Sequence, residues 1–152
     1  GELWLDARRC DGLPVESRGL GILFQDALLF DQFSVGQNLL LALPEHIVGR
    51  ARREAVEQAL DSAGLSGHYA SDPATVSGGG RARGSLLRAL LAEPQALLLD
   101  EPFSRLDKAV RATCRTGVLA GVRARNIPVV LVTHDEDDIP PGGELIEISR
   151  WQ

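Results

Sequence analysis

An apolar run that ends in two adjacent carboxylates constrains this chain more than any other stretch. Residues 96–101 read Ala-Leu-Leu-Leu-Asp-Glu, and Pro102 follows them directly. A short, continuously hydrophobic run is typical of a parallel strand that is buried on both faces. Sheets of this kind bind ligands outside the carboxyl ends of their strands, so Asp100 and Glu101 are candidate site residues. Taken alone, an Asp-Glu pair is more often part of a solvated turn, so the neighbouring segments decide between the two interpretations.

Segments on either side of this run favour a site. Ser77 is a good helix N-cap, and Gly78 and Gly79 follow it before leucines at helical spacing. The N-terminus of such a helix attracts anions, and glycines let backbone N–H groups approach them closely. Downstream, residues 129–132 form a second apolar run, which continues into Thr-His-Asp with His134 at its centre. The sequence therefore predicts polar groups after two buried strands and an anion-binding turn before them.

Together these segments resemble the ATP-binding subunit of an ABC transporter. The motifs stand in the order of that family and span about residues 22–135, which makes chance resemblance a poor explanation. They are the Q-loop glutamine (Gln25), the signature motif (Ser77-Gly78-Gly79), the Walker B strand with the catalytic glutamate (97–102), the D-loop (104–107) and the switch histidine (His134).

The resemblance implies a catalytic role for four residues. Asp100 is expected to hold Mg²⁺, and Glu101 is expected to activate the attacking water as a general base. His134 is expected to contact the γ-phosphate of ATP. Gln25 is expected to help hold both the Mg²⁺ and the attacking water. The expected activity is therefore ATP hydrolysis.

The resemblance also implies partners. Members of the family sandwich nucleotide between two domains that meet head to tail. Ser77, Gly78 and Gly79 are thus expected to bind ATP held by a second ATP-binding subunit, and Asp107 is expected to lie at that seam. A transmembrane permease subunit is the other expected partner, and it would hold the chain at the cytoplasmic face of the cell membrane.

An apolar cluster at residues 27–30 and Phe33 has two interpretations of about equal weight. It is either ordinary core or the docking surface for the permease, since exposed apolar patches mark interfaces. The pattern over about residues 28–39 resembles importer subunits more than the DNA-repair relatives. Substrate identity cannot be derived from these residues.

One expected motif is missing. The sequence contains no G-x-x-x-x-G-K-[ST] phosphate loop, and its only lysine is Lys108. It therefore resembles the distal part of an ATPase domain, beginning after the phosphate loop and its helix. Gly80 stands where the family has Gln or Glu, and Gly84 and Ser85 stand at two usually apolar positions. The alternative hypothesis is a non-catalytic, degenerate module that supplies only its signature face to a complete ATPase.

The order of segments predicts an α/β fold of the P-loop NTPase type, incomplete, with a parallel sheet and an inserted helical subdomain. We expect one domain, with residues 1–31 and 78–152 in the α/β core and 32–77 in the helical subdomain. The expected strands are 1–6, 20–24, 96–100, 129–132 and 145–148. The expected helices are 34–43, which opens with a Ser-x-x-Gln capping box, and 50–63, 77–92 and 106–125.

Composition excludes several classes of protein. The net charge of −5 argues against a nucleic-acid partner, and so against an ABC protein that acts on DNA or ribosomes. Two cysteines far apart in sequence make neither a disulfide framework nor a metal site. No apolar run approaches the roughly 20 residues that span a bilayer, so membrane association is expected to depend on a partner.

Overall fold

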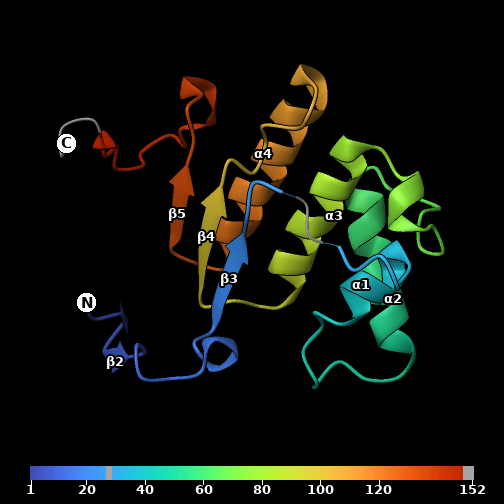
Figure 1. Cartoon of the computed structure of the whole chain (residues 1–152), viewed down its shortest axis with the longest axis horizontal. Coiled ribbons are helices and arrows are strands. Elements are labelled where there is room, and N and C mark those ends of the chain that lie inside the picture. The colour runs from blue at the N-terminus through green and yellow to red at the C-terminus, as the bar shows by residue number, and fades with distance from the viewer. Residues whose placement is uncertain (27–28, 149–152) are drawn as a thin grey trace.

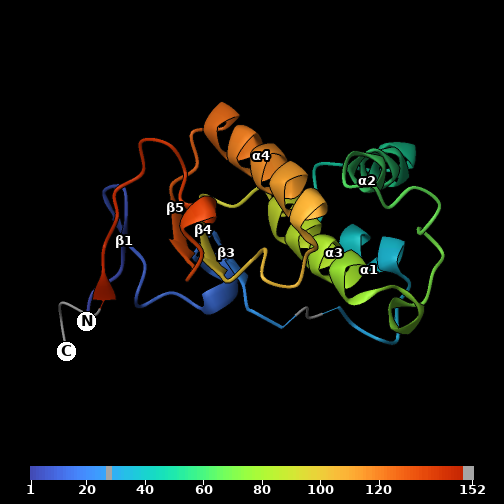
Figure 2. The same cartoon turned by 90° about the horizontal axis from the view of Figure 1, so that it is seen from above.

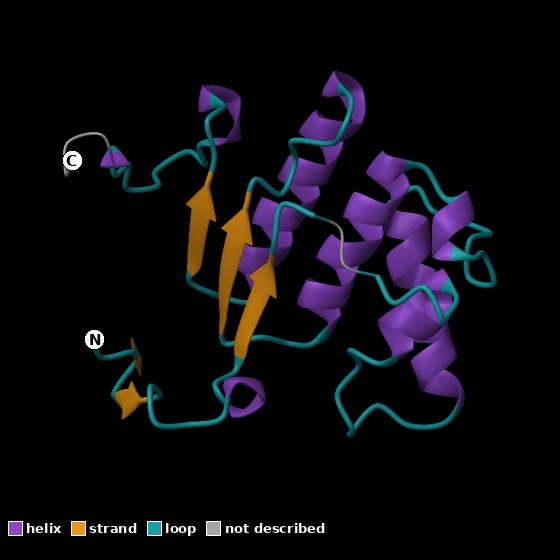
Figure 3. Ribbon diagram, in the orientation of Figure 1, coloured by secondary structure: helices purple, strands orange, loops and turns teal. Residues whose placement is uncertain are grey.

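A parallel sheet forms the centre of the fold (Figures 1 and 3). The structure is a computed structural model, and it describes residues 1–26 and 29–148. Strands β3 (Leu20–Leu23), β4 (Ala96–Asp100) and β5 (Val129–Val132) pair in parallel in the order β3-β4-β5. The strands predicted at 20–24, 96–100 and 129–132 are confirmed, as is the α/β class with a parallel sheet.

Two helices cover one face of this sheet (Figure 2). They are α3 (Gly78–Leu91) and α4 (Lys108–Ala124), close to the bounds predicted from leucine and valine spacing. Side chains alternate along a strand, so every second residue points at the helices. The buried cluster between sheet and helices contains Leu23, Leu86, Leu97, Leu99, Phe103, Leu106, Val118 and Val122.

The opposite face of the sheet is open over the part of the chain that is described. Its apolar side chains are Ile22, Leu98, Val130 and Val132, which are 40%, 36%, 60% and 46% exposed. The expectation that the 96–100 strand is buried on both faces is therefore wrong. The strand has the apolar sequence of a strand buried on both faces. Within residues 1–26 and 29–148, however, helices cover only one face of the sheet.

The remaining helices pack into a second hydrophobic cluster. Helix α1 (Val35–Leu40) begins at the predicted capping box, in which Ser34 and Gln37 cap each other's backbone N–H groups. It ends three residues before the predicted Leu43. Helix α2 (Arg50–Ser62) ends next to Gly64, whose φ of +66° suits the residue after a helix. Because α3 contributes to both clusters, it joins the two parts of the fold. The subdomain boundaries at residues 32 and 77 stay a prediction.

The chain ends differ from expectation. Only Trp4–Leu5 of the predicted 1–6 strand is extended (β1), and it pairs with β2 (Arg8–Arg9) in a small hairpin. Residues 145–148, which are all described, form no strand, and Leu145, Ile146 and Ile148 are more than 60% exposed. A strand needs a neighbouring strand to hydrogen-bond with its backbone, and the sequence pattern of one segment does not show whether such a neighbour exists. Short 3-10 turns complete the fold: η1 (Val15–Ser17), η2 (Pro73–Thr75) and η3 (Glu136–Asp138).

We predict that this chain self-associates through its open sheet face and the outer edge of β5. An edge strand with exposed apolar residues is a template for pairing with another chain. Replacing Val130 by Lys should shift the mass measured by light scattering toward that of one chain, because a charge on an edge strand opposes such pairing.

The matched control is Val48→Lys, because Val48 is 69% exposed in a loop of the helical part and should not affect association. Hydrogen exchange checks whether the exposed segment 145–148 is protected within a single chain. A strictly monomeric chain with strong amide protection at Leu145, Ile146 and Ile148 would contradict the prediction.

Candidate functional site

The candidate site lies at the carboxyl edge of the sheet, where β4 and β5 end side by side. Asp100 is paired in register with Val132, so the residues that follow each strand emerge together. Glu101 follows β4, and His134 follows β5 after Thr133. The sequence placed both residues after parallel strands, and the structure brings them into contact.

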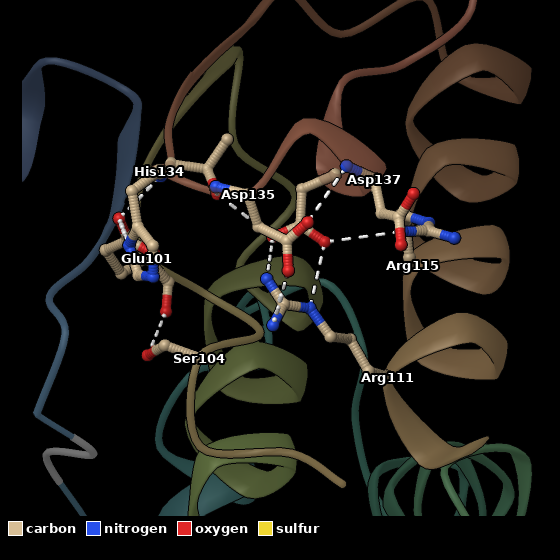
Figure 4. A network of polar contacts seen from close by, with 9 residues as sticks. Glu101, Ser104, Arg111, Arg115, His134, Asp135 and Asp137 are labelled. Atoms are coloured by element: carbon tan, nitrogen blue, oxygen red, sulfur yellow. Dashed lines mark hydrogen bonds and ion pairs between the residues drawn. The ribbon is translucent and has the colours of Figure 1, made fainter. Parts of the chain in front are cut away.

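Glu101 and His134 form the central contact of the site (Figure 4). The Nδ1 atom of His134 lies 2.6 Å from Oε1 of Glu101, and the backbone N–H of His134 donates to the same oxygen over 2.9 Å. A carboxylate only accepts hydrogen bonds, so Nδ1 carries the proton and Nε2 is the ring nitrogen left for another group. The Glu101 side chain is 13% exposed and the His134 side chain 77%. The pair therefore joins a shielded carboxylate to an exposed ring.

The backbone of Glu101 is held in an uncommon conformation. Its φ is +47°, in the left-handed region that residues with a side chain rarely adopt. Its N–H donates to Val132 O over 2.9 Å, and its carbonyl accepts from the N–H and the hydroxyl of Ser104 over 3.2 and 2.9 Å. Pro102 then occupies the second position of the turn, which its fixed φ favours. These bonds fix the direction in which the carboxylate leaves the strand.

Asp100 and Gln25 present polar groups at the same edge. Asp100 is exposed, and its carboxylate makes no hydrogen bond or ion pair within residues 1–26 and 29–148. Carboxylate oxygens suit Mg²⁺, so this free carboxylate fits the expected ligand role. Gln25 and Glu101 line one small hollow of about 10 Å³. The described residues contain no group of three His, Cys, Asp or Glu side chains arranged around a metal position.

The signature turn is built by a helix cap. The hydroxyl of Ser77 caps α3 by accepting the Gly80 N–H over 3.1 Å, as its N-cap position predicts. Gly78 is exposed, and a Cβ built on Gly79 would lie 3.5 Å from the carbonyl of Arg105. The signature turn and the 104–107 loop are therefore neighbours. The role of this turn toward nucleotide stays a prediction.

Two other positions have clear structural roles. A Cβ on Gly80 would lie 2.4 Å from Cγ1 of Val76, so Gln or Glu at this position requires Val76 to move. Asp107 caps α4, where its carboxylate accepts the Val110 N–H over 3.1 Å. Its predicted place at a dimer seam stays a prediction.

A buried ion-pair cluster beside His134 was missed from the sequence. Asp138 is fully buried and accepts from Nε of Arg111 over 3.1 Å, from Nη2 of the same guanidinium, and from Arg115 over 3.4 Å. Thr133 donates to it over 3.0 Å, and Arg111 also pairs with Asp135 over 3.1 Å. Figure 4 shows Arg111 on α4 pointing toward the loop that carries His134 and Asp135. The run of acids at 135–138 was the available signal, but nothing in it identifies which acid is buried.

Charge pairing sets the protonation of this cluster. Burial by itself raises the pKa of Asp138, but hydrogen bonds from Arg111, Thr133 and Arg115 outweigh burial and hold the pKa below its usual value. The hydrogen bond to Asp138 in turn raises the pKa of Arg111. Thr133 and Asp135, on the two sides of His134, are thus held near α4. Thr133 bonds to Asp138, which pairs with Arg111, and Asp135 pairs with Arg111 directly.

A second hollow, of about 330 Å³, lies beside β3, between α3 and the turn that follows α1. Phe24, Phe30 and Leu41 line it and are about half exposed. Arg88 also lines it, with its guanidinium 5.0 Å from the centre of the Phe30 ring, and burial lowers the pKa of Arg88. Its Nη1 atom is buried, and no hydrogen-bond partner for it occurs within residues 1–26 and 29–148. Part of the apolar cluster predicted at 27–30 thus lines a groove, while residues 27–28 lie outside the described residues.

Comparisons with known proteins identify the family that this chain is similar to. A family model described as ABC transporter matches residues 1–104. The chain is 62% identical to an uncharacterized ABC transporter ATP-binding protein of Escherichia coli K12, YnjD, over 99% of this chain and 70% of that protein. It is 36% identical to the Fe(3+) ions import ATP-binding protein FbpC of Streptomyces avermitilis, over 99% of this chain and 44% of that protein.

A solved structure shares the fold. The dimeric ATP-binding cassette MJ0796, in a post-hydrolysis state bound to ADP and Pi, superposes with a TM-score of 0.76 at 25% identity. The match covers 91% of this chain and 64% of the cassette. The chain thus spans 44% of the iron-import subunit, 64% of the solved cassette and 70% of YnjD.

Proposed function

Because this chain belongs to the family of ABC transporter ATP-binding proteins, we propose that it is part of an ATPase subunit that powers transport through a membrane permease. The observation that carries the proposal is the contact between Glu101 and His134 at the carboxyl edge of the sheet. The free carboxylate of Asp100 beside it supports a site for ATP with Mg²⁺.

The chemistry we assign follows from these groups. Mg²⁺, when bound with ATP, neutralises charge on the β- and γ-phosphates. Asp100 would hold it, with Gln25 as a second oxygen ligand. The carboxylate of Glu101, held by two hydrogen bonds from His134 to its Oε1, is the group that would accept the proton of the attacking water. The exposed Nε2 of His134 is the atom that would contact the γ-phosphate.

Two partners belong to the proposal. A second ATP-binding subunit would meet the signature residues Ser77, Gly78 and Gly79 and the D-loop residue Asp107, head to tail. The dimeric state of the structurally similar cassette supports this arrangement. A transmembrane permease would dock on the groove lined by Phe24 and Phe30, at the cytoplasmic face of the membrane.

Across residues 1–26 and 29–148, no helix is both long enough and apolar enough to cross a lipid bilayer. The name of the similar iron-import subunit supports an importer, which we propose as the direction of transport.

We predict that the 152-residue chain alone hydrolyses ATP no faster than the buffer background. It contains no phosphate-loop sequence to cradle the phosphates, so Asp100 and Glu101 have no fixed phosphate on which to act. A phosphate-release assay checks this, with heat-denatured chain as the control. Turnover that disappears in Glu101→Gln would contradict it.

A degenerate, non-catalytic module is the second candidate. The missing phosphate-loop sequence favours it, as does Gly80, where a longer side chain displaces Val76. The coding DNA upstream of Gly1 separates the two candidates. A phosphate loop in frame supports the ATPase, and a start codon at or near Gly1 supports the module.

A further inference from the structure

Two buried polar atoms near the site have no hydrogen-bond partner among the residues that the structure describes. One is Oε2 of Glu101, and the other is the hydroxyl of Ser85, a residue of α3 that is 3% exposed. Each atom has less than 1 Å² of its surface exposed to solvent. Buried polar atoms in native proteins nearly always have a partner, which is a protein group or an ordered water. Two such atoms close to one hollow therefore call for a common explanation.

Both residues line the hollow of about 10 Å³ that Gln25 also lines. A water needs about 10–15 Å³ and two or more polar partners, and this hollow meets the lower limit of size. Its remaining walls are Arg105, whose guanidinium pairs with Asp26, and four residues without a side-chain donor: Leu23, Phe24, Ala82 and Pro102. The space is too small for a second molecule beside the first.

We propose that a single ordered water bridges Ser85 and Glu101, and that Ser85 is a positioning residue for the Glu101 carboxylate. The water donates one proton to Oε2 of Glu101 and its other proton to the hydroxyl oxygen of Ser85, or accepts from that hydroxyl. This inference rests on the proposed function, in which Glu101 is the general base.

The hydrogen-bond capacity of the carboxylate is consistent with this role. A carboxylate has about four acceptor positions. Two on Oε1 are occupied by the N–H and Nδ1–H of His134. The bridging water occupies one of the two on Oε2, which is the buried oxygen of the pair. The carboxylate is then held from β5 through His134 and from the signature helix α3 through Ser85, so that it cannot rotate away from the nucleotide side.

The structural test is a high-resolution crystal structure of the chain and of Ser85→Ala. We expect one water within hydrogen-bond distance of both Ser85 Oγ and Glu101 Oε2, and its loss or displacement in the variant. A dry hollow, or a direct hydrogen bond between Ser85 and Glu101, would overturn the proposal. The Nδ1 proton resonance of His134 in solution is a second readout, and it should shift in Ser85→Ala because the carboxylate loses one of its two anchors.

The kinetic test uses the ATPase subunit of the proposed function, in which a phosphate loop precedes this chain and which we call the full-length parent. Ser85→Ala should lower kcat for ATP about tenfold, the effect expected of one hydrogen bond to a charged group, with KM unchanged. Ser62→Ala is the matched control, because that hydroxyl is exposed and bonds only to the backbone of its own helix. An unchanged kcat in Ser85→Ala contradicts the positioning role alone, whereas turnover that survives Glu101→Gln contradicts the proposed function itself.

Discussion

In the full-length parent, Glu101→Gln is expected to lower ATP turnover by at least about 100-fold while ATP affinity changes little. The amide oxygen of Gln can still accept the two hydrogen bonds from His134, so the geometry at the edge of the sheet survives. The amide nitrogen that replaces Oε2 cannot accept a proton from water. Turnover should therefore fail at the chemical step, and the ATP-bound dimer should accumulate.

Steady-state phosphate release and nucleotide binding measured on the same preparation check this result. Gel filtration with ATP reports the trapped dimer. Glu136→Gln is the matched control, because Glu136 is an exposed acid on the loop after β5 and should leave both quantities unchanged. Equal losses of affinity and turnover in Glu101→Gln would show instead that Glu101 is a binding residue.

Local sequence signals were sufficient for the elements of the fold. The capping boundaries at Ser34 and Ser77 depend on side chains within three residues of the helix start, and both caps form as predicted. Short apolar runs likewise predicted β3, β4 and β5, because each run is bounded by turn residues. These predictions needed no knowledge of distant parts of the chain.

Predictions that depended on a distant neighbour were less successful. The 145–148 segment has a strand-like sequence but forms no strand, and the far side of β4 is open, because neither has a packing partner among the described residues. Residue types indicated Glu101 and His134, which lie 33 positions apart, but only the family resemblance gave each its role. The pairing of Arg111 with Asp138, 27 positions apart, has no local signature at all.

Asp138→Asn is expected to destabilise the chain by about 3–5 kcal/mol at pH 7, because it leaves Arg111 without its buried counter-charge. A loss of that size is a large fraction of the roughly 5–15 kcal/mol that stabilises a domain. Asp137→Asn is the matched control, since Asp137 is exposed and no side-chain pairing of it appears in the described structure. Urea unfolding followed by circular dichroism measures both free energies.

The pH dependence gives an independent check with a defined sign. The pKa of Asp138 is lower in the folded chain than its usual value, so its charge stabilises the fold above the unfolded pKa of about 3.9. That contribution is lost as the pH falls through the folded pKa, and the difference between the wild-type chain and Asp138→Asn should shrink over the same range. A difference that stays constant between pH 7 and pH 2 would show that the charge is not the cause.

A paired replacement separates charge from packing. Removing both charges with Arg111→Met and Asp138→Leu leaves no fully buried ion unpaired, because the side chains of Arg115 and Asp135, which each lose a partner, are 25% and 35% exposed. Apolar replacements of buried ion pairs are often neutral or stabilising. We therefore expect the double variant to be more stable than either single variant. The double variant would also free the loop around His134 from α4, because Thr133 and Asp135 lose the partners that hold them. In the full-length parent it should thus keep its fold while its ATP turnover falls, which a purely structural role for the pair does not predict.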